Sequence, residues 1–130
     1  MTDQRPLTEL VTSHQARVTL KVALKITVIW GLTDEQTRTL LGSPSPDTLQ
    51  AWKEGGGPPL GEETILRTGH IVSIYRSLDT LLPLASAAHS WIKRPNDNPL
   101  YKGRRPLDVI LESLDGLQVT VRHLLAEIYS

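Results

Sequence analysis

Apolar residues between Val18 and Trp30 alternate with polar ones, and this pattern fits two secondary structures. Apolar side chains occupy every even position from 18 to 30, which is the period of a half-buried strand. Helical spacing is present as well, since Val18, Val22 and Ile26 are four residues apart. No second strand follows for pairing, and an isolated strand leaves its backbone groups without hydrogen bonds. We therefore predict a helix from about Thr8 to Trp30.

Two short helices are predicted between residues 33 and 54, because their ends carry clear signals. Thr33 and Gln36 form a capping box for the first helix, which stops at Gly42. Ser45 and Pro46 supply the N-cap and the first helical residue of the second. Two short helices joined at a glycine are typical of a helix-turn-helix, whose second helix enters the major groove of DNA.

The glycine- and proline-rich run from 55 to 59 is the clearest break in the chain. We place a boundary there, between an N-terminal helix-turn-helix-like lobe (residues 1–57) and a C-terminal helical domain (residues 58–130). Further helices are predicted at about 62–82, 84–91, 107–114 and 117–128, with a loop over 95–105. The predicted fold class is all-α.

Four residues of the second half are expected to shape the fold. Trp91 is predicted to anchor the core, Gly103 to form a turn, and Pro106 to be the first residue of a helix. Gly116 is predicted to follow the end of that helix, at the position where a left-handed backbone is needed.

Composition limits the classes of protein that fit. The chain has 130 residues and no cysteine, so disulfides and thiolate sites are excluded. Fourteen basic residues balance fourteen acidic ones, which is unusual for a nucleic-acid-binding protein. No secretion signal or membrane-spanning stretch is recognisable. We expect a cytoplasmic protein without a membrane partner.

No arrangement of residues predicts an enzyme, a metal site or a cofactor. The four histidines are scattered, and none pairs with another at the spacing of metal ligands. His123 and Glu127 lie four residues apart on the last predicted helix, where a surface pair is the usual explanation. The triple glycine at 55–57 follows no strand, so it is interpreted as a linker and not as a phosphate-binding loop.

An ordered set of residues near the C-terminus resembles the C-terminal domain of the Xre/MbcA/ParS-type antitoxins. The set runs from Trp91-Ile92-Lys93-Arg94-Pro95-Asn96 through Gly103, Pro106-Leu107-Asp108 and Gly116-Leu117 to Val121-Arg122. The Leu-Leu-Gly at 40–42, followed by a short helix that ends near Trp52, is similar to the N-terminal half of the same family. The resemblance covers most of the chain from about Val18 and also places a helix at 18–30.

The resemblance implies an antitoxin of a type II toxin–antitoxin system, which blocks the active site of a RES-domain toxin that degrades NAD. It places the blocking element in the last helix and tail, where a tyrosine ring and the terminal carboxylate suit a pocket for a charged dinucleotide. A homodimer within a larger toxin–antitoxin complex is also implied. The predicted toxin-binding residues are Arg122, Leu125, Glu127, Tyr129 and Ser130, together with the basic loop residues Lys102, Arg104 and Arg105.

The family often represses its own operon, so operator DNA is a second expected partner. The predicted DNA-binding residues are Ser45, Thr48, Gln50 and Lys53. Two features depart from the motif: Arg38 stands where a small residue is usual, and the second helix offers no arginine for guanine. The helix pair at 33–54 nevertheless gives the alternative function, a stand-alone helix-turn-helix transcriptional regulator, and a helical adaptor without a toxin partner is a third.

Overall fold

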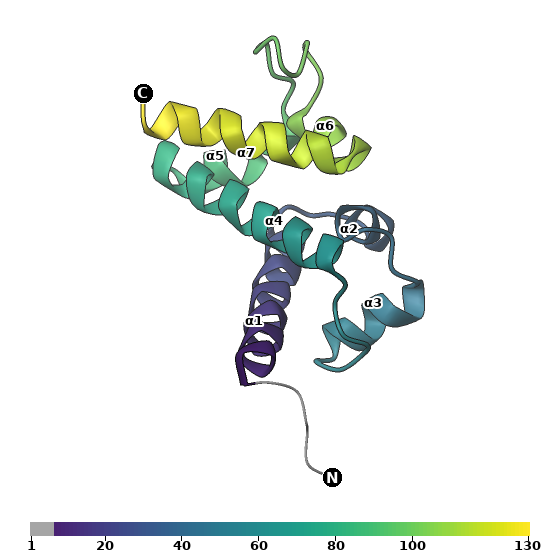
Figure 1. Ribbon diagram of the computed structural model, residues 1–130. Helices are drawn as coiled ribbons and strands as arrows, with labels where there is room; N and C mark the ends of the chain where they lie inside the picture. Colours follow the sequence, from purple (N-terminus) through teal and green to yellow (C-terminus); the bar gives the residue numbers. More distant parts are fainter. Residues whose placement is uncertain (1–6) are drawn as a thin grey trace.

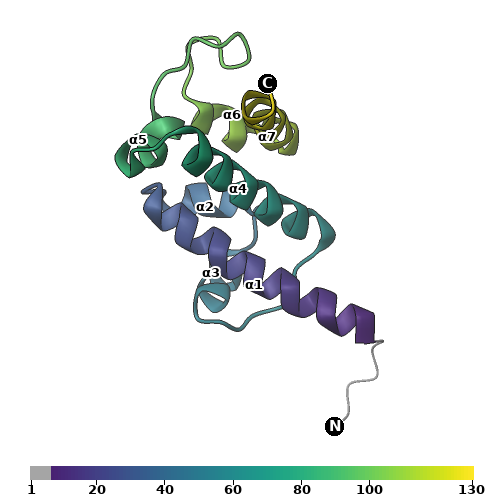
Figure 2. The same ribbon diagram turned by 90° about the vertical axis from the view of Figure 1, so that its left-hand side faces the viewer.

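The computed structural model describes the backbone of residues 7–130 and the side chains of residues 13–130. This part of the chain is all-α, as predicted, and contains no strand. Figures 1 and 2 show its elements. They are α1 (Leu7–Ile29), α2 (Asp34–Leu40), α3 (Pro46–Lys53), α4 (Glu62–Leu81), α5 (Ala85–Ser90), a 3₁₀ turn η1 (Trp91–Lys93), α6 (Pro106–Glu112) and α7 (Leu114–Ile128).

Residues 18–30, whose alternation also fitted a strand, are helical up to Ile29. The buried positions explain why. They recur mostly at a spacing of three and four residues, on a helix that packs against α4, and they are Ala16, Leu20, Ala23, Ile26, Thr27 and Trp30. Val18, Val22 and Val28 are exposed instead. The strand-like alternation thus arose from valines that lie outside the core.

Helices α2 and α3 have the ends that the sequence predicted. The Thr33 side chain accepts a hydrogen bond from the Gln36 backbone, and the Gln36 side chain accepts one from the Thr33 backbone. Gly42 ends α2 in a left-handed conformation, with φ of 94°. Ser45 caps α3, and Pro46 is its first residue.

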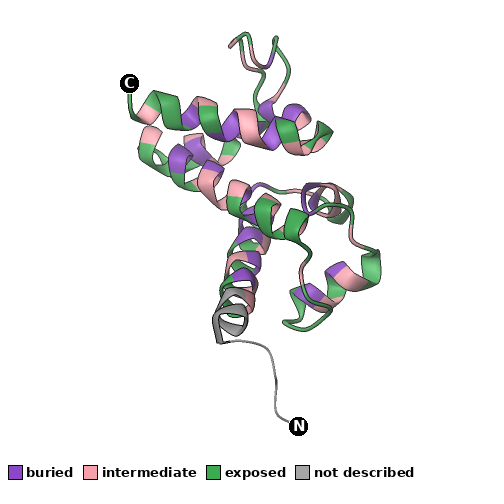
Figure 3. Ribbon diagram, viewed as in Figure 1, coloured by how far each residue is buried: buried purple, intermediate pink, exposed green. Residues whose placement is uncertain are grey.

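Helix α4 is the centre of the molecule. It packs against α1 on one side and against α7 on another, and Figure 2 shows it lying between these two helices. Its residues Ile71, Ile74 and Leu78 are almost fully buried. Figure 3 shows buried positions recurring between exposed ones along α1, α4 and α7, as expected for helices that each place one side in a common core.

The break between α6 and α7 differs from the predicted one. Helix α6 ends at Glu112, and α7 begins at Leu114 with Ser113 as its N-cap. Gly116 therefore lies in the first turn of α7, and the prediction that it ends the preceding helix was wrong. The serine side chain accepts a hydrogen bond from the Gly116 backbone N–H at 3.0 Å. A one-residue junction between two helices left no glycine or proline signal in the sequence.

The remaining predicted elements are confirmed, with small shifts at their ends. Pro106 is the first residue of α6 and Gly103 lies in a turn with φ of 80°. Trp91 is half-buried and packs against the core from η1. Among the described residues, no helix is apolar enough over a sufficient length to cross a membrane.

Candidate partner-binding surface

The C-terminal half of α7 has one side in the core and one side in solvent. Leu117, Val121 and Leu124 are buried, and α7 packs on α4. On the other side, a stripe at helical spacing is exposed; it consists of Arg122, Leu125, Ala126 and Tyr129, and we call it the tail stripe. Helix α7 therefore presents apolar surface outward near its end.

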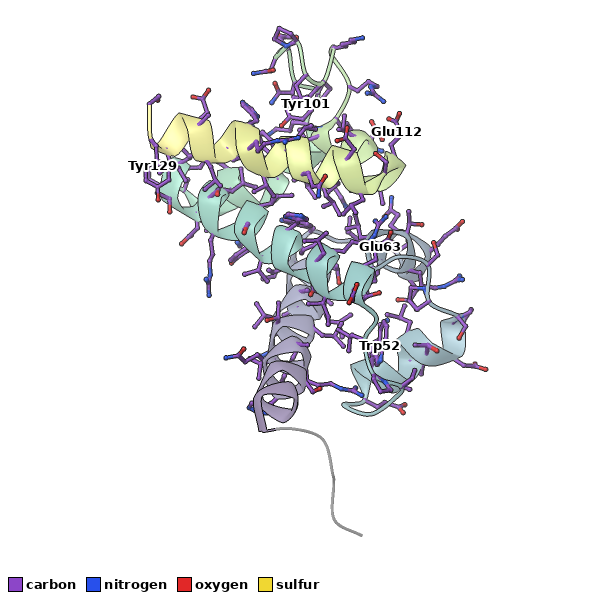
Figure 4. The ribbon with its side chains drawn as sticks, viewed as in Figure 1. Trp52, Glu63, Tyr101, Glu112 and Tyr129 are labelled. Carbon is purple, nitrogen blue, oxygen red and sulfur yellow. The ribbon has the colours of Figure 1, made fainter. Side chains whose placement is uncertain are left out.

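The tail stripe is unusual because its apolar members are large. Tyr129 is 83% exposed and Leu125 is 38% exposed. Figure 4 shows Tyr129 at the far end of α7, where α4 also ends. Tyrosine and arginine are enriched among the residues that anchor protein–protein contacts, and Leu125 adds apolar area beside them.

Glu127 does not belong to this stripe. Its carboxylate lies 3.9 Å from Nε2 of His123, on the side of α7 that faces the 95–105 loop. Ser130 is exposed beyond the helix end, and its hydroxyl donates a hydrogen bond to the backbone carbonyl of Glu127. The structure thus divides the predicted tail residues between two sides of α7.

His123 is part of a polar cluster that sequence reasoning missed. The Tyr101 hydroxyl lies 2.8 Å from Nδ1 of His123, and the Asn98 amide nitrogen lies 3.3 Å from Nε2. Trp91 contacts both rings, with centroid distances of 5.8 Å to Tyr101 and 6.4 Å to His123. The expected surface pair of His123 and Glu127 is therefore one edge of a cluster that ties the loop to α7. Asn98, Tyr101 and Trp91 lie 22 to 32 positions before His123 in the sequence, so no local pattern predicted this cluster.

Burial determines the ionisation of Tyr101. Its side chain has no exposed area, and this burial raises the pKa of Tyr101 to about 12. The phenol is thus a neutral hydrogen-bonding group at ordinary pH and is suited to holding the loop in place.

A cavity of about 340 Å³ opens beside this cluster. Its walls are apolar on the α4 side and polar on the loop side, and include Leu78, Trp91, Asn96, His123 and Glu127. A cavity of this size is at the lower end of the range for ligand sites. The cavity lies between the 95–105 loop and α7, and Glu127 lines it.

The basic loop is less cationic than its sequence suggests. Arg104 forms an ion pair with Glu112 at 2.8 Å, and Arg105 forms one with Asp108 at 2.7 Å. The Arg105 guanidinium holds the pKa of Asp108 below its ordinary value. Lys102 is exposed in a left-handed conformation with φ of 53°.

The loop arginines also lie away from the tail. Figure 4 shows Glu112, the partner of Arg104, and Tyr129 at opposite ends of the C-terminal half. The structure therefore separates the two groups of predicted toxin-binding residues along the length of α7, and only the tail stripe carries exposed apolar side chains.

The predicted DNA-binding residues of α3 are largely engaged with neighbouring residues. The Ser45 hydroxyl accepts a hydrogen bond from the Thr48 backbone and donates one to the Thr48 hydroxyl. Gln50 donates to the Glu54 carboxylate at 3.0 Å, and Lys53 pairs with Asp34 of α2.

Arg38, the departure from the helix-turn-helix pattern, has a structural role. Its Nε donates a hydrogen bond to the backbone carbonyl of Pro44 at 2.7 Å, which braces the turn between α2 and α3. A half-buried arginine can occupy this position because its guanidinium reaches the turn and needs no space between the two helices.

No group of three His, Asp or Glu side chains within the described residues is placed to hold a metal ion.

Comparison with known proteins supplies one relative. No family model matches the chain. The chain is 37% identical over 102 residues to the uncharacterized protein y4oB of Sinorhizobium fredii, and the match covers 77% of each protein. The chain belongs to the family of that protein. An alignment of this extent means that the y4oB family shares most of the helical body described above.

Proposed function

We propose that this member of the y4oB family is the antitoxin of a type II toxin–antitoxin system, and that it blocks the active site of a RES-domain toxin that degrades NAD. The proposal combines the resemblance of residues 91–122 to the antitoxin domain with one observation. That observation is the exposed tail stripe on α7, which offers Leu125 and Tyr129 to a partner.

The geometry supports a plug that enters a pocket end-on. The tail stripe lies at the last turns of α7, and the buried side of the same helix is fixed on α4. A rigid helix end binds with a smaller loss of conformational entropy than a flexible tail, because its side chains are already arranged. Arg122 adds a cation beside the apolar surface and suits an acidic group at the rim of the toxin pocket.

The test is rescue of growth in cells that express a RES-domain toxin encoded beside this gene, together with an assay of NAD in the same cells. Wild-type protein should restore both growth and NAD. Leu125→Asp combined with Tyr129→Ala should lose rescue, because a buried carboxylate in an apolar contact is costly. Deleting residues 125–130 should have the same effect.

Leu66→Asp is the matched control for Leu125→Asp. Leu66 is 43% exposed and lies in the first half of α4, so the variant adds the same charge to a similarly exposed site away from the tail. It should rescue as well as the wild type. Rescue by the tail deletion would reject the plug while leaving an antitoxin that binds elsewhere, and failure of the wild type to bind or rescue would reject the antitoxin proposal.

The alternative function, a stand-alone transcriptional regulator, receives less support from the geometry. Two acidic residues, Asp47 and Glu54, are exposed on or next to α3, and Lys53 is paired with Asp34. Binding to its promoter fragment that weakens steeply with salt, and that is lost in Lys53→Glu, would favour the alternative.

A further inference from the structure

A long groove separates α1 from α3 in the N-terminal half. It has a volume of about 720 Å³, and Figure 4 shows Trp52 in the space between these two helices. Its floor is mainly apolar and contains Leu20, Leu24, Leu32 and Trp52. None of the residues assigned to the tail stripe lines it.

The groove is long enough to hold a helix of several turns. On α1 its lining extends from His14 to Val28, which corresponds to about 21 Å at 1.5 Å per residue. A single inserted side chain would fill only part of this length. An amphipathic helix of about four turns would lie along it and place an apolar side chain in the groove at each turn.

Hydrogen bonds fix the walls of the groove. Arg17 of α1 donates to the backbone carbonyls of Gly56 and Gly57 at 2.6 and 2.7 Å, and the Trp52 indole donates to the carbonyl of Pro58 at 2.8 Å. These bonds hold the 55–59 loop across one end. The groove is therefore already formed before a partner binds, which lowers the cost of binding.

The rim of the groove is cationic. Arg17, Lys21 and Lys25 line it from α1, and Lys53 lines it from α3, against the acidic groups of Asp34 and Glu54. Lys53 is paired with Asp34. Lys21 and Lys25 are exposed, and neither makes an ion pair with another described side chain.

The outer edge of the groove adds exposed apolar surface. Val18 is 49% exposed and Val28 is 76% exposed, one near each end of the α1 wall. A concave apolar surface bordered by valines and exposed lysines matches a ligand with an apolar stripe and acidic flanks.

We propose that this groove binds an amphipathic helix of a partner protein, with leucine-like residues along its buried stripe and Asp or Glu beside them. The acidic residues would meet Lys21 and Lys25, and the apolar stripe would cover Leu24 and Trp52. The inference is independent of the proposed antitoxin function, because it concerns a different surface of the molecule.

A designed peptide provides the probe. It is a fluorescently labelled helix of about four turns, with leucine at every third or fourth position and glutamate at the flanking positions. The peptide should bind the full-length protein in an anisotropy titration at low ionic strength, and the affinity should fall as salt is added. A peptide with lysine in place of each glutamate should not bind.

The decisive variant is Lys21→Glu combined with Lys25→Glu. Both side chains are exposed, so the fold should be retained, as checked by circular dichroism. The dissociation constant should increase at least tenfold, about 1.4 kcal/mol. Arg76→Glu combined with Arg94→Glu is the matched control, since it changes net charge equally at exposed sites outside the groove, and it should leave the affinity close to the wild-type value.

Three results would overturn the proposal. The first is no binding of the glutamate peptide, and the second is equal binding of the lysine peptide. The third is a wild-type homodimer in sedimentation that the double lysine variant converts to a monomer, because a second copy of this chain would then be the occupant.

Discussion

Tyr101 shows how a single buried side chain can join distant parts of the chain. Its hydroxyl lies 2.8 Å from His123, although it comes from the loop before α6 and the histidine comes from α7. The ring is fully buried and contacts Trp91 edge-on. Leaving this buried hydroxyl without a partner would cost about 1–3 kcal/mol, whereas breaking an exposed ion pair typically costs about 0–1 kcal/mol.

The raised pKa of Tyr101 predicts a loss of stability at alkaline pH. Burial raises this pKa to about 12, while an unfolded chain has a value of about 10. Between these values the unfolded chain releases the phenol proton and the folded chain keeps it. The free energy of unfolding should therefore fall as pH rises above about 10, by up to about 1.4 kcal/mol per pH unit.

Urea unfolding of the wild type and of Tyr101→Phe at a series of alkaline pH values measures this effect. The variant lacks the phenol, so its stability should decline less steeply, whereas other titrating groups contribute equally to both proteins. Below about pH 10 the two curves should run parallel, separated by the lost hydrogen bond. Equal slopes above that pH would contradict the prediction.

Gly116 of α7 lies directly against the backbone of α6. A Cβ atom on this glycine would stand 2.0 Å from the carbonyl oxygen of Val109, and real atoms do not approach so closely. The neighbour is backbone and cannot rotate away. The glycine is therefore required by the contact between the two helices and not by a left-handed conformation.

Gly116→Ala should accordingly destabilise the protein by about 1–3 kcal/mol, as overpacking of a core does. Gly69→Ala is the matched control. Gly69 also lies within a helix, α4, but a Cβ atom there would meet nothing within 4 Å. It should stabilise the protein by about 0.5–1 kcal/mol, because alanine favours a helix over glycine. Thermal or urea unfolding of both variants tests this, and the changes in the free energy of unfolding should have opposite signs.

Features of the helices that depend on neighbouring residues were predicted, and those that depend on contacts between helices were not. The caps of α2 and α3 were predicted because Thr33 and Ser45 act within three residues of themselves. The start of α7 was not predicted. Gly116 lies inside the first turn of that helix, and the need for glycine comes from its contact with the Val109 backbone, which the local sequence does not reveal. The predicted helix at 18–30 is confirmed up to Ile29, although its exposed valines have the period of a strand.

The same distinction applies to the candidate surface. The resemblance to the antitoxins assigned Arg122, Leu125, Glu127 and Tyr129 to one binding surface. In the structure Arg122, Leu125 and Tyr129 lie on one exposed stripe, whereas Glu127 lies beside His123. The pairing of the loop arginines with Asp108 and Glu112 was not predicted, since it depends on how the loop folds over α6. The groove between α1 and α3 left no sequence signal, because it is formed by two elements that do not fill the space between them.

The whole molecule is organised around one continuous core. Its buried residues come from both sides of the predicted boundary at residue 57, and they include Trp30 and Leu40 before it and Ile71, Ile110 and Leu117 after it. Helix α4 contacts α1 and α7, and α2 contacts α6. The two halves therefore share buried surface, and separating them would expose apolar area on both.

A shared core predicts that the protein unfolds in a single cooperative transition. In Trp91→Phe, fluorescence reports only Trp30 and Trp52 in the N-terminal half, whereas far-UV circular dichroism reports all helices. The two signals should give the same urea midpoint. Adding Ile71→Val, at a fully buried position of α4, should lower both midpoints together, at a cost of about 1 kcal/mol. If the fluorescence midpoint moved apart from the helical one, the halves would unfold independently, and the loop at 55–59 would be a true domain boundary.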